Sequence, residues 1–224
     1  EFGVELALQL REQGQDVSEI VAMTLGGDKA GETVRIALAM GADSGVHIND
    51  PALESLNEVF AAAVLAEAAK LDEAGFDLVL CGKNNIDLDS GAIGPAVAEF
   101  LGIPHVGAVT GLEFADDGTT FTARRRIEGA EEILAGSLPA LLTIEKGLVE
   151  PRYPSLPNLM KAKKKPIKVL TTSDLSVDES LKTATHFESI APPPPRAECR
   201  FVEGEPEDMA KELVRLLREE AKVV

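Results

Sequence analysis

One loop of this 224-residue chain combines residue types that can hold a phosphate group. It runs from Cys81 to Pro95 and carries two aspartates, one serine and three glycines. An apolar strand over Asp77–Cys81 leads into the loop, and a helix over about Gly91–Leu101 follows it. Backbone N–H groups at the start of such a helix have no partner inside the helix, and the helix dipole favours an anion there. The pattern predicts a nucleotide phosphate as the leading ligand, with an ordinary capped strand-to-helix turn as the alternative.

Within this loop, the backbone amides from Ser90 to Ile93 are the groups that we expect to donate to a phosphate. The Ser90 hydroxyl adds a further donor or caps the helix. Asp87 and Asp89 are not expected to face the phosphate directly, because like charges repel. Instead, we expect them to fix the loop or to accept hydrogen bonds from amides or from a ribose.

The elements that must position this loop alternate between strand and helix. The apolar patterns predict, in chain order, a helix over 2–13, a strand over 19–25, a helix over 28–41, a strand over 44–48, a helix over 50–74 and a strand over 77–81. Asp28 is predicted to cap the second helix, and Asp50 the third with Pro51 at its first position. This order implies an α/β, Rossmann-like and mostly parallel sheet with helices on both faces. Ligands bind beyond the carboxyl ends of such strands, where the loops at 25–27 and 82–94 are expected to meet.

Beyond Pro104 the pattern changes to an antiparallel extension of the sheet. Its strands are predicted over 106–114, 119–126, 131–135 and 140–144, with a hairpin turn at Asp116–Gly118. A separate strand is predicted over 167–170, in the less regular region that follows Gly147. The proline-rich stretch at 150–160 is not expected to be helical throughout. A stiff arm with Pro192–Pro195 then leads to a last helix over 206–222.

We therefore predict two domains. Residues 1–170 form the nucleotide-binding α/β domain. Residues 171–224 form a C-terminal arm and helix that docks on a partner subunit, with docking on its own core as the alternative. Because the helical pattern begins at Glu1 with no strand before it, the first strand of the sheet is expected upstream.

Composition excludes several classes of function. The chain has 22 Lys and Arg against 38 Asp and Glu, a net charge of −16, which argues against binding to nucleic acid or to anionic lipid. No apolar run reaches the ~18 residues of a spanning helix, so direct membrane insertion is not expected. Cys81 and Cys199 are far apart and the three histidines show no ligand spacing, so no metal site is predicted. The cysteine usage favours a reducing compartment.

Four stretches in order along the chain carry a family resemblance. They are residues 32–43 (ETVRIALAMGAD), the Cys81–Gly82–Lys83 loop with its two aspartates, residues 125–132 (RRIEGAEE) and residues 150–165 (EPRYPSLPNLMKAKKK). On these residues the chain resembles the β subunit of electron transfer flavoprotein over essentially its full length.

The resemblance implies a heterodimer in which the α subunit carries a redox-active FAD. The β subunit would hold AMP, or a second FAD in members that bifurcate electrons. Electrons would arrive from a dehydrogenase, often an acyl-CoA dehydrogenase, and leave to a quinone reductase or another acceptor. Such a chain is an electron-carrier subunit and not an enzyme in its own right.

The resemblance also assigns the cofactor-binding residues. They are Leu25, Gly26, Gly82, Lys83, Asn84, Asn85, Ile86, Asp87, Asp89, Ser90, Gly91, Ala92, Ile93 and Gly94. Members that bind AMP place polar side chains after Asp89, where this chain has residues 91–93 (GAI). Ser90 and residues 93–95 are closer to the FAD-binding type, which carries Gln where Ala92 stands. Both nucleotides therefore stay open.

A second stretch is implied to be the loop that docks a partner dehydrogenase. Its residues are Tyr153, Pro154, Ser155, Leu156, Pro157, Asn158, Leu159, Met160 and Lys161. Leu156 would be the anchor that fills an apolar pocket on the partner, held in place by the flanking prolines. The alternative is that Leu156 packs into its own core. The lysines at 161–165 form a solvated face or steer an acidic partner.

Arg126 departs from the family pattern. Relatives place an acid at this position, where it pairs with an arginine of the partner's flavin domain. Arg126 would repel that arginine, so the resting position of the flavin domain is expected to differ.

Two other classes of protein fit the residues less well than the electron-transfer subunit. An ATP-pyrophosphatase or adenylate-forming enzyme needs a Ser/Gly-rich loop that neither Gly26–Gly27–Asp28 nor Ser90–Gly91 matches. A nucleotide-sensing module of the universal-stress type leaves the docking loop and the long arm without a role. No Ser-His-Asp or Cys-His pattern supports a hydrolase.

Overall fold

The chain forms a large unit over residues 1–186 and a second unit over residues 187–224. The structure is a computed structural model. It describes residues 1–50, 53, 57–72, 75–86, 89–183, 188–189, 191–196 and 198–223.

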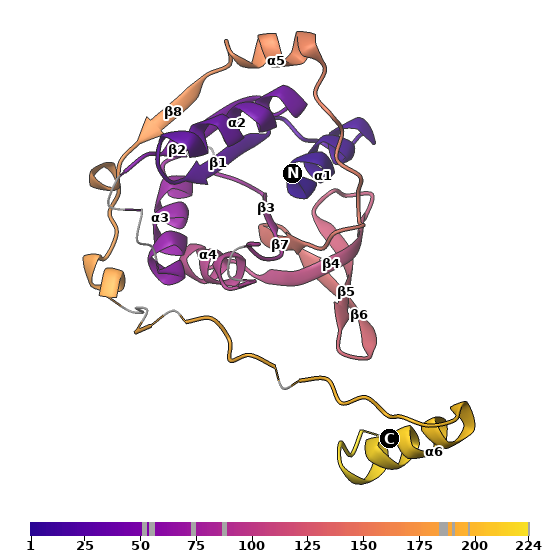
Figure 1. The fold of residues 1–224 in the computed structure, drawn as a ribbon. Helices are drawn as coiled ribbons and strands as arrows, with labels where there is room; N and C mark the ends of the chain where they lie inside the picture. Colours follow the sequence, from indigo (N-terminus) through magenta and orange to yellow (C-terminus); the bar gives the residue numbers. More distant parts are fainter. Residues whose placement is uncertain are drawn as a thin grey trace. The chain divides into compact units, whose positions relative to one another are not determined.

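Three parallel strands form the first sheet of the large unit (Figure 1). Their order is β1 (Val21–Leu25), β2 (Ser44–Ile48) and β8 (Ile167–Leu170). Successive side chains of β1 alternate between the two faces, so Ala22 packs on one side and Met23 and Leu25 on the other. The sequence predicted all three strands, β1 two residues too long at its start.

Five strands form the second sheet. Their order is β3 (Leu78–Gly82), β7 (Ala140–Ile144), β4 (His105–Phe114), β5 (Thr120–Ile127) and β6 (Ala130–Ser137). The first three are parallel, and β5 and β6 continue the sheet as antiparallel hairpins. Every residue of β7 is buried, because this strand lies between two neighbours and under helices on both faces. The predicted antiparallel extension is confirmed for β4, β5 and β6, whereas β7, predicted as part of it, is a parallel strand between β3 and β4.

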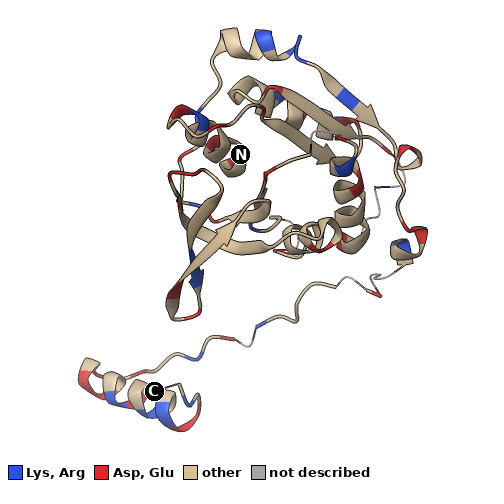
Figure 2. Cartoon of the chain, turned by 180° about the vertical axis from the view of Figure 1, so that it is seen from behind, with Lys and Arg blue, Asp and Glu red and all other residues tan. Residues whose placement is uncertain are grey.

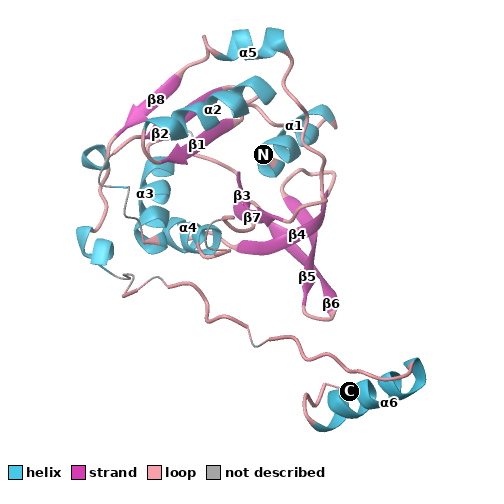
Figure 3. Ribbon diagram, in the orientation of Figure 1, coloured by secondary structure: helices cyan, strands magenta, loops and turns pink. Residues whose placement is uncertain are grey.

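Helices cover both faces of the sheets, as the sequence predicted. They are α1 (Phe2–Glu12), α2 (Asp28–Met40), α3 (Glu58–Lys70) and α4 (Ile93–Leu101). Helices α1 and α2 share one apolar cluster, in which Leu8 meets Val34 and Leu38. Helices α3 and α4 lie side by side on the other face, where Ala62 packs near Val97 (Figure 3).

The start of α3 is the largest correction to the predicted elements. The prediction of a helix over 50–74 is wrong at both ends, because the helix runs from Glu58 to Lys70. Asn57 caps it, since its Oδ1 accepts a hydrogen bond from the Phe60 N–H at 2.7 Å. Asp50 instead accepts the N–H of Thr172 at 3.1 Å and so holds the segment after β8. Pro51 and Ala74 lie outside the described residues.

Two smaller corrections concern caps. Gly27, and not Asp28, is the N-cap of α2, since Gly27 has an extended backbone and the helix begins at Asp28. The Asp28 carboxylate instead accepts a hydrogen bond from Asn49 Nδ2 at 2.8 Å. Helix α4 begins two residues later than predicted, after Ala92.

The remaining elements are short or stand apart from the sheets. Helix α5 (Leu156–Ala162) packs on α2, and two 3₁₀ turns, η2 (Thr172–Asp174) and η3 (Glu179–Thr183), follow β8. In the second unit, helix α6 (Pro206–Glu219) exposes Met209 and Leu213. None of the helices described combines the length and apolar character that a membrane span needs.

Candidate functional site

A pocket of about 330 Å³ opens at the carboxyl end of β1, beside α3 and the loop that follows β3. Its lining residues are Met23, Thr24, Leu25, Glu58, Ala61, Leu65, Asn85 and Ile93. The lining is mostly apolar with a few polar groups at one end, as in sites for small organic ligands, and the volume is near the lower limit of such sites. Of the predicted cofactor residues, Leu25, Asn85 and Ile93 line this pocket.

Glu58 supplies the charge of the pocket. The Ser90 hydroxyl donates a hydrogen bond to Glu58 Oε2 at 2.7 Å, and Asn85 Nδ2 lies 3.5 Å from Glu58 Oε1. Asn85 Oδ1 in turn accepts the Ser90 N–H at 3.3 Å. A carboxylate in this position repels a phosphate and accepts hydrogen bonds from hydroxyl or amino groups.

Several predicted residues of the same loop point elsewhere. Lys83 Nζ forms an ion pair with Glu145 at 2.8 Å. Asn84 donates a hydrogen bond to Asp89, which has a left-handed backbone (φ 51°). Ile86 is 97 % exposed. Asp87 lies outside the described residues.

Some backbone groups at the start of α4 are already engaged within the loop. The Ala92 N–H donates to Ser90 Oγ at 3.3 Å, so two of the four amides predicted to hold phosphate, those of Ser90 and Ala92, bond within the loop. Gly94 has a packing role, because a methyl group there would lie 2.5 Å from Thr143 Cγ2 on β7. Gly82 and Gly91 are exposed at the loop surface.

The second predicted strand-end loop, at Gly26, is held by the end of β2. Gly26 has φ 139°, its N–H donates to the Ile48 carbonyl at 3.0 Å, and its own carbonyl lies 3.0 Å from His47 Nε2. Because a carbonyl only accepts, the His47 ring carries its proton on Nε2 in this contact. The turn therefore has a fixed place beside Leu25 at the pocket.

The predicted docking stretch is exposed. Exposed fractions are 98 % for Tyr153, 78 % for Leu156 and 63 % for Met160. Ser155 caps α5, since its hydroxyl accepts the Asn158 N–H at 3.4 Å, and Pro157 lies in the first turn. Pro154 is half-buried, and Pro157, Leu159 and Lys161 are exposed. With this exposure Leu156 is not a core residue of the large unit, contrary to the alternative in which it packs into the core.

Comparison with known proteins decides the family. The sequence profile described as "Electron transfer flavoprotein domain" matches residues 1–175. A relative named "Electron transfer flavoprotein subunit beta" from Bacillus subtilis (strain 168) is 43 % identical over 100 % of this chain and 86 % of its own length. The chain belongs to the electron transfer flavoprotein β-subunit family.

Other relatives agree with this membership. The "Electron transfer flavoprotein subunit beta" of Sus scrofa is 39 % identical over 98 % of this chain and 82 % of its own length. The "Electron transfer flavoprotein subunit beta, mitochondrial" of Arabidopsis thaliana is 35 % identical over 100 % of this chain and 84 % of its own. Membership of the β-subunit family implies electron transfer linked to flavin, a carrier role and an α subunit as the counterpart of this chain.

The residue pattern left five pocket residues of this β-subunit family member unassigned: Met23, Thr24, Glu58, Ala61 and Leu65. Glu58, Ala61 and Leu65 are spaced by three and four along α3, so they share one face of the helix. That spacing was the available signal. The predicted helix start at Asp50 concealed this signal, because it placed Glu58 in the middle of the predicted helix and not in its first turn.

The basic cluster of β5 is placed on the sheet extension. Arg126 is exposed and pairs in register with Glu131 of β6. Its neighbour Arg125 forms an ion pair with Glu132 at 2.7 Å.

Burial raises the pKa of the Cys81 thiol to about 11, so this cysteine is a packing residue. Within the described part of the chain, no cluster of three His, Cys, Asp or Glu side chains could bind a metal.

Proposed function

We propose that this chain is the β subunit of a heterodimeric electron transfer flavoprotein that binds an adenine nucleotide, AMP or a second FAD. It docks a dehydrogenase, such as an acyl-CoA dehydrogenase, through the segment Tyr153–Lys161. The reduced dehydrogenase then gives up a pair of electrons to the FAD of the α subunit, which passes them to a quinone reductase or another acceptor. Residues 171–224 form an arm that docks on the α subunit. The bacterial cytoplasm is the favoured compartment, ahead of the mitochondrial matrix.

The observation that carries the nucleotide proposal is the pocket at the carboxyl end of β1. It has the location that ligands take in open α/β sheets, and the start of α4 lies beside it. A wall of Met23, Leu65 and Ile93 offers apolar contact to a flat base.

The charge of Glu58 fixes how a nucleotide would lie. Its carboxylate excludes the phosphate and accepts hydrogen bonds from ribose hydroxyls or from the adenine amino group. The phosphate would lie toward the start of α4, where the N–H groups of the first turn favour an anion. A ligand in this position replaces the Ser90–Glu58 contact with its own hydroxyl.

The size of the pocket favours AMP. A volume of about 330 Å³ is close to the smallest that ligand sites have, and FAD adds a second phosphate, a ribityl chain and an isoalloxazine to the same nucleoside. The small residues at Gly91 and Ala92 leave room for the larger ligand at the exposed rim.

Nucleotide analysis of the purified heterodimer tests this assignment. Acid extraction, chromatography and flavin absorbance should give one FAD and one AMP for each dimer. Leu65→Trp fills the pocket and should remove AMP, whereas Leu71→Trp, at the exposed end of α3, should keep it. Two FAD for each dimer would instead identify the electron-bifurcating type, and a dimer without nucleotide in this chain would overturn the proposal.

Leu156→Ala tests the docking role. We expect an unchanged nucleotide content and an intact dimer, but a rate of flavin reduction by a reduced acyl-CoA dehydrogenase that is about tenfold lower below saturation, since a single apolar anchor can dominate an interface. Val169→Ala removes a side chain of similar exposure from β8 and should leave the rate unchanged. Equal rates for the wild type and Leu156→Ala across dehydrogenase concentrations would remove Leu156 from docking.

A further inference from the structure

The segment Tyr153–Lys161 is exposed, yet both of its ends are fixed to the large unit. Its apolar side chains Tyr153, Leu156 and Met160 are more than half exposed. Exposed loops with such side chains are usually mobile, and ordering them on binding costs free energy. The contacts at the two ends of the segment determine whether it is already ordered before docking or becomes ordered during docking.

Arg152 fixes the first end to α1. Its Nε and Nη2 donate to the two oxygens of Glu5 at 2.8 and 2.9 Å, and its Nη1 and Nη2 donate to Glu12 at 2.6 and 3.0 Å. The Arg152 backbone N–H donates to the same Glu5 at 3.1 Å. Glu5 is only 3 % exposed and also accepts from Gln9 Nε2 at 2.9 Å. The arginine and the main chain are thus both held by one buried carboxylate.

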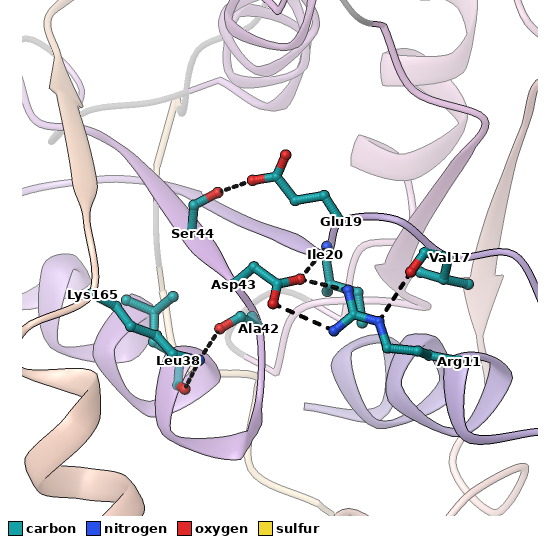
Figure 4. Close-up of polar contacts among 9 residues, drawn as sticks. All are labelled: Arg11, Val17, Glu19, Ile20, Leu38, Ala42, Asp43, Ser44 and Lys165. Carbon is teal, nitrogen blue, oxygen red and sulfur yellow. Dashed lines mark hydrogen bonds and ion pairs between the residues drawn. The ribbon is translucent and has the colours of Figure 1, made fainter.

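Lys165 and Arg35 fix the second end to α2. Lys165 Nζ donates to the carbonyls of Ala42 at 2.5 Å and Leu38 at 3.2 Å, at the end of that helix (Figure 4). Arg35 Nη1 donates to the carbonyls of Ala162 and Lys165, both at 2.8 Å. Ala162 itself is buried at 2 % exposure.

The two anchoring helices form one base. Leu8 of α1 and Val34 and Leu38 of α2 belong to the same apolar cluster. Next to this cluster, Arg11 of α1 pairs with Asp43 directly after α2 at 2.5 Å (Figure 4). The distance between the two ends of the segment is therefore set by a packed helix pair and not by the segment itself.

We propose that Arg152 is a positioning residue for docking: with Lys165 at the other end, it holds Tyr153–Lys161 as a preformed apolar ridge that enters a dehydrogenase pocket without being ordered on binding. This inference rests on the proposed docking function. Arg152 touches neither the dehydrogenase nor a cofactor in this role. It acts through the geometry of the segment.

Lysine cannot replace Arg152 in this role. A guanidinium presents several N–H donors in one plane, so it bonds Glu5 and Glu12 at the same time, whereas an ammonium is a single point charge. Arg152→Lys therefore keeps the positive charge and removes the planar set of N–H donors. Arg125→Lys is the matched control, since Arg125 also bonds a carboxylate, that of Glu132, but lies on β5 of the sheet extension.

The experiment uses the intact heterodimer with a reduced acyl-CoA dehydrogenase as the probe. For Arg152→Lys we expect the KM for the dehydrogenase to rise about tenfold while kcat at saturation stays unchanged. Amide hydrogen exchange in residues 155–161 should accelerate by a similar factor, and both values should stay near those of the wild type in Arg125→Lys.

Two outcomes overturn the inference. One is a wild-type KM in Arg152→Lys while Leu156→Ala still slows reduction, which would leave the docking function intact and remove Arg152 from it. The other is a raised KM with unchanged exchange in residues 155–161, which would show that Arg152 does not act by ordering the segment. Failure of the docking function itself is recognised separately, by a Leu156→Ala variant as fast as the wild type.

Discussion

Glu5 is the residue on which the start of the docking segment depends. The hydrogen bond from Arg152 is the main reason why the pKa of the Glu5 carboxyl falls to about 2, with Gln9 assisting and burial opposing. The pKa of Arg152 is raised in turn, by its hydrogen bonds to Glu5 and then Glu12. A buried carboxylate with this many donors is stable only when ionised.

This pKa makes the stability of the protein depend on pH. The pKa of the Glu5 carboxyl is 4.5 in the unfolded chain and about 2 in the folded one, so its contribution, on the order of 3 kcal/mol, is present above pH 4.5 and is lost as pH falls toward 2. We expect Glu5→Gln to lower the thermal midpoint of the heterodimer at pH 7 and this difference to shrink between about pH 4.5 and 2. A difference that stays constant over the range would contradict the assignment. Thermal scans at matched ionic strength measure it, with Gln9→Ala as the control for loss of a neutral partner.

At the level of elements, the sequence predicted the strands and helices well wherever apolar periodicity was strong. Strands β2, β7 and β8 were predicted at their observed bounds, and the bounds of α1 and β4 differ by only one residue. The start of α3 was missed because its cap, Asn57, is stabilised by the distant carbonyls of Leu181 and Lys182, each at 2.8 Å. Such a long-range contact leaves no local pattern.

The candidate site was predictable in location but only in part in composition. Parallel strands bring their carboxyl ends together, so Leu25 and the loop after β3 could be assigned to one edge. Glu58 comes from a helix whose start depends on tertiary contacts, and its contact with Ser90 could not be read from spacing. In the same way, the family motif around Arg152 suggested the docking stretch proposed above, but not that Arg152 is bound by Glu5, which lies 147 residues earlier.

At the level of the whole chain, charge is distributed unevenly. The net charge is −16, but exposed lysines lie at the end of the docking segment (Lys161) and directly after it (Lys163 and Lys164), on and after α5 (Figure 2). If the net charge governs association with an acidic partner, the association rate rises with salt. If the lysine patch governs it, the rate falls with salt. An acidic dehydrogenase is repelled by the chain as a whole and attracted by the lysine patch.

Salt dependence separates the two cases. Raising ionic strength from about 0.01 to 0.15 M shortens the screening length from about 30 to 8 Å. If the patch steers docking, the second-order rate of flavin reduction by an acidic dehydrogenase should fall several-fold over this range.

Flavin reduction in the double variant Lys163→Gln/Lys164→Gln should be slower at low salt and less sensitive to salt. Lys29→Gln/Lys146→Gln makes the same change of charge at exposed positions of the large unit and should behave as the wild type. A rate that rises with salt would show that the net charge governs the encounter, because screening would then remove a repulsion and not an attraction.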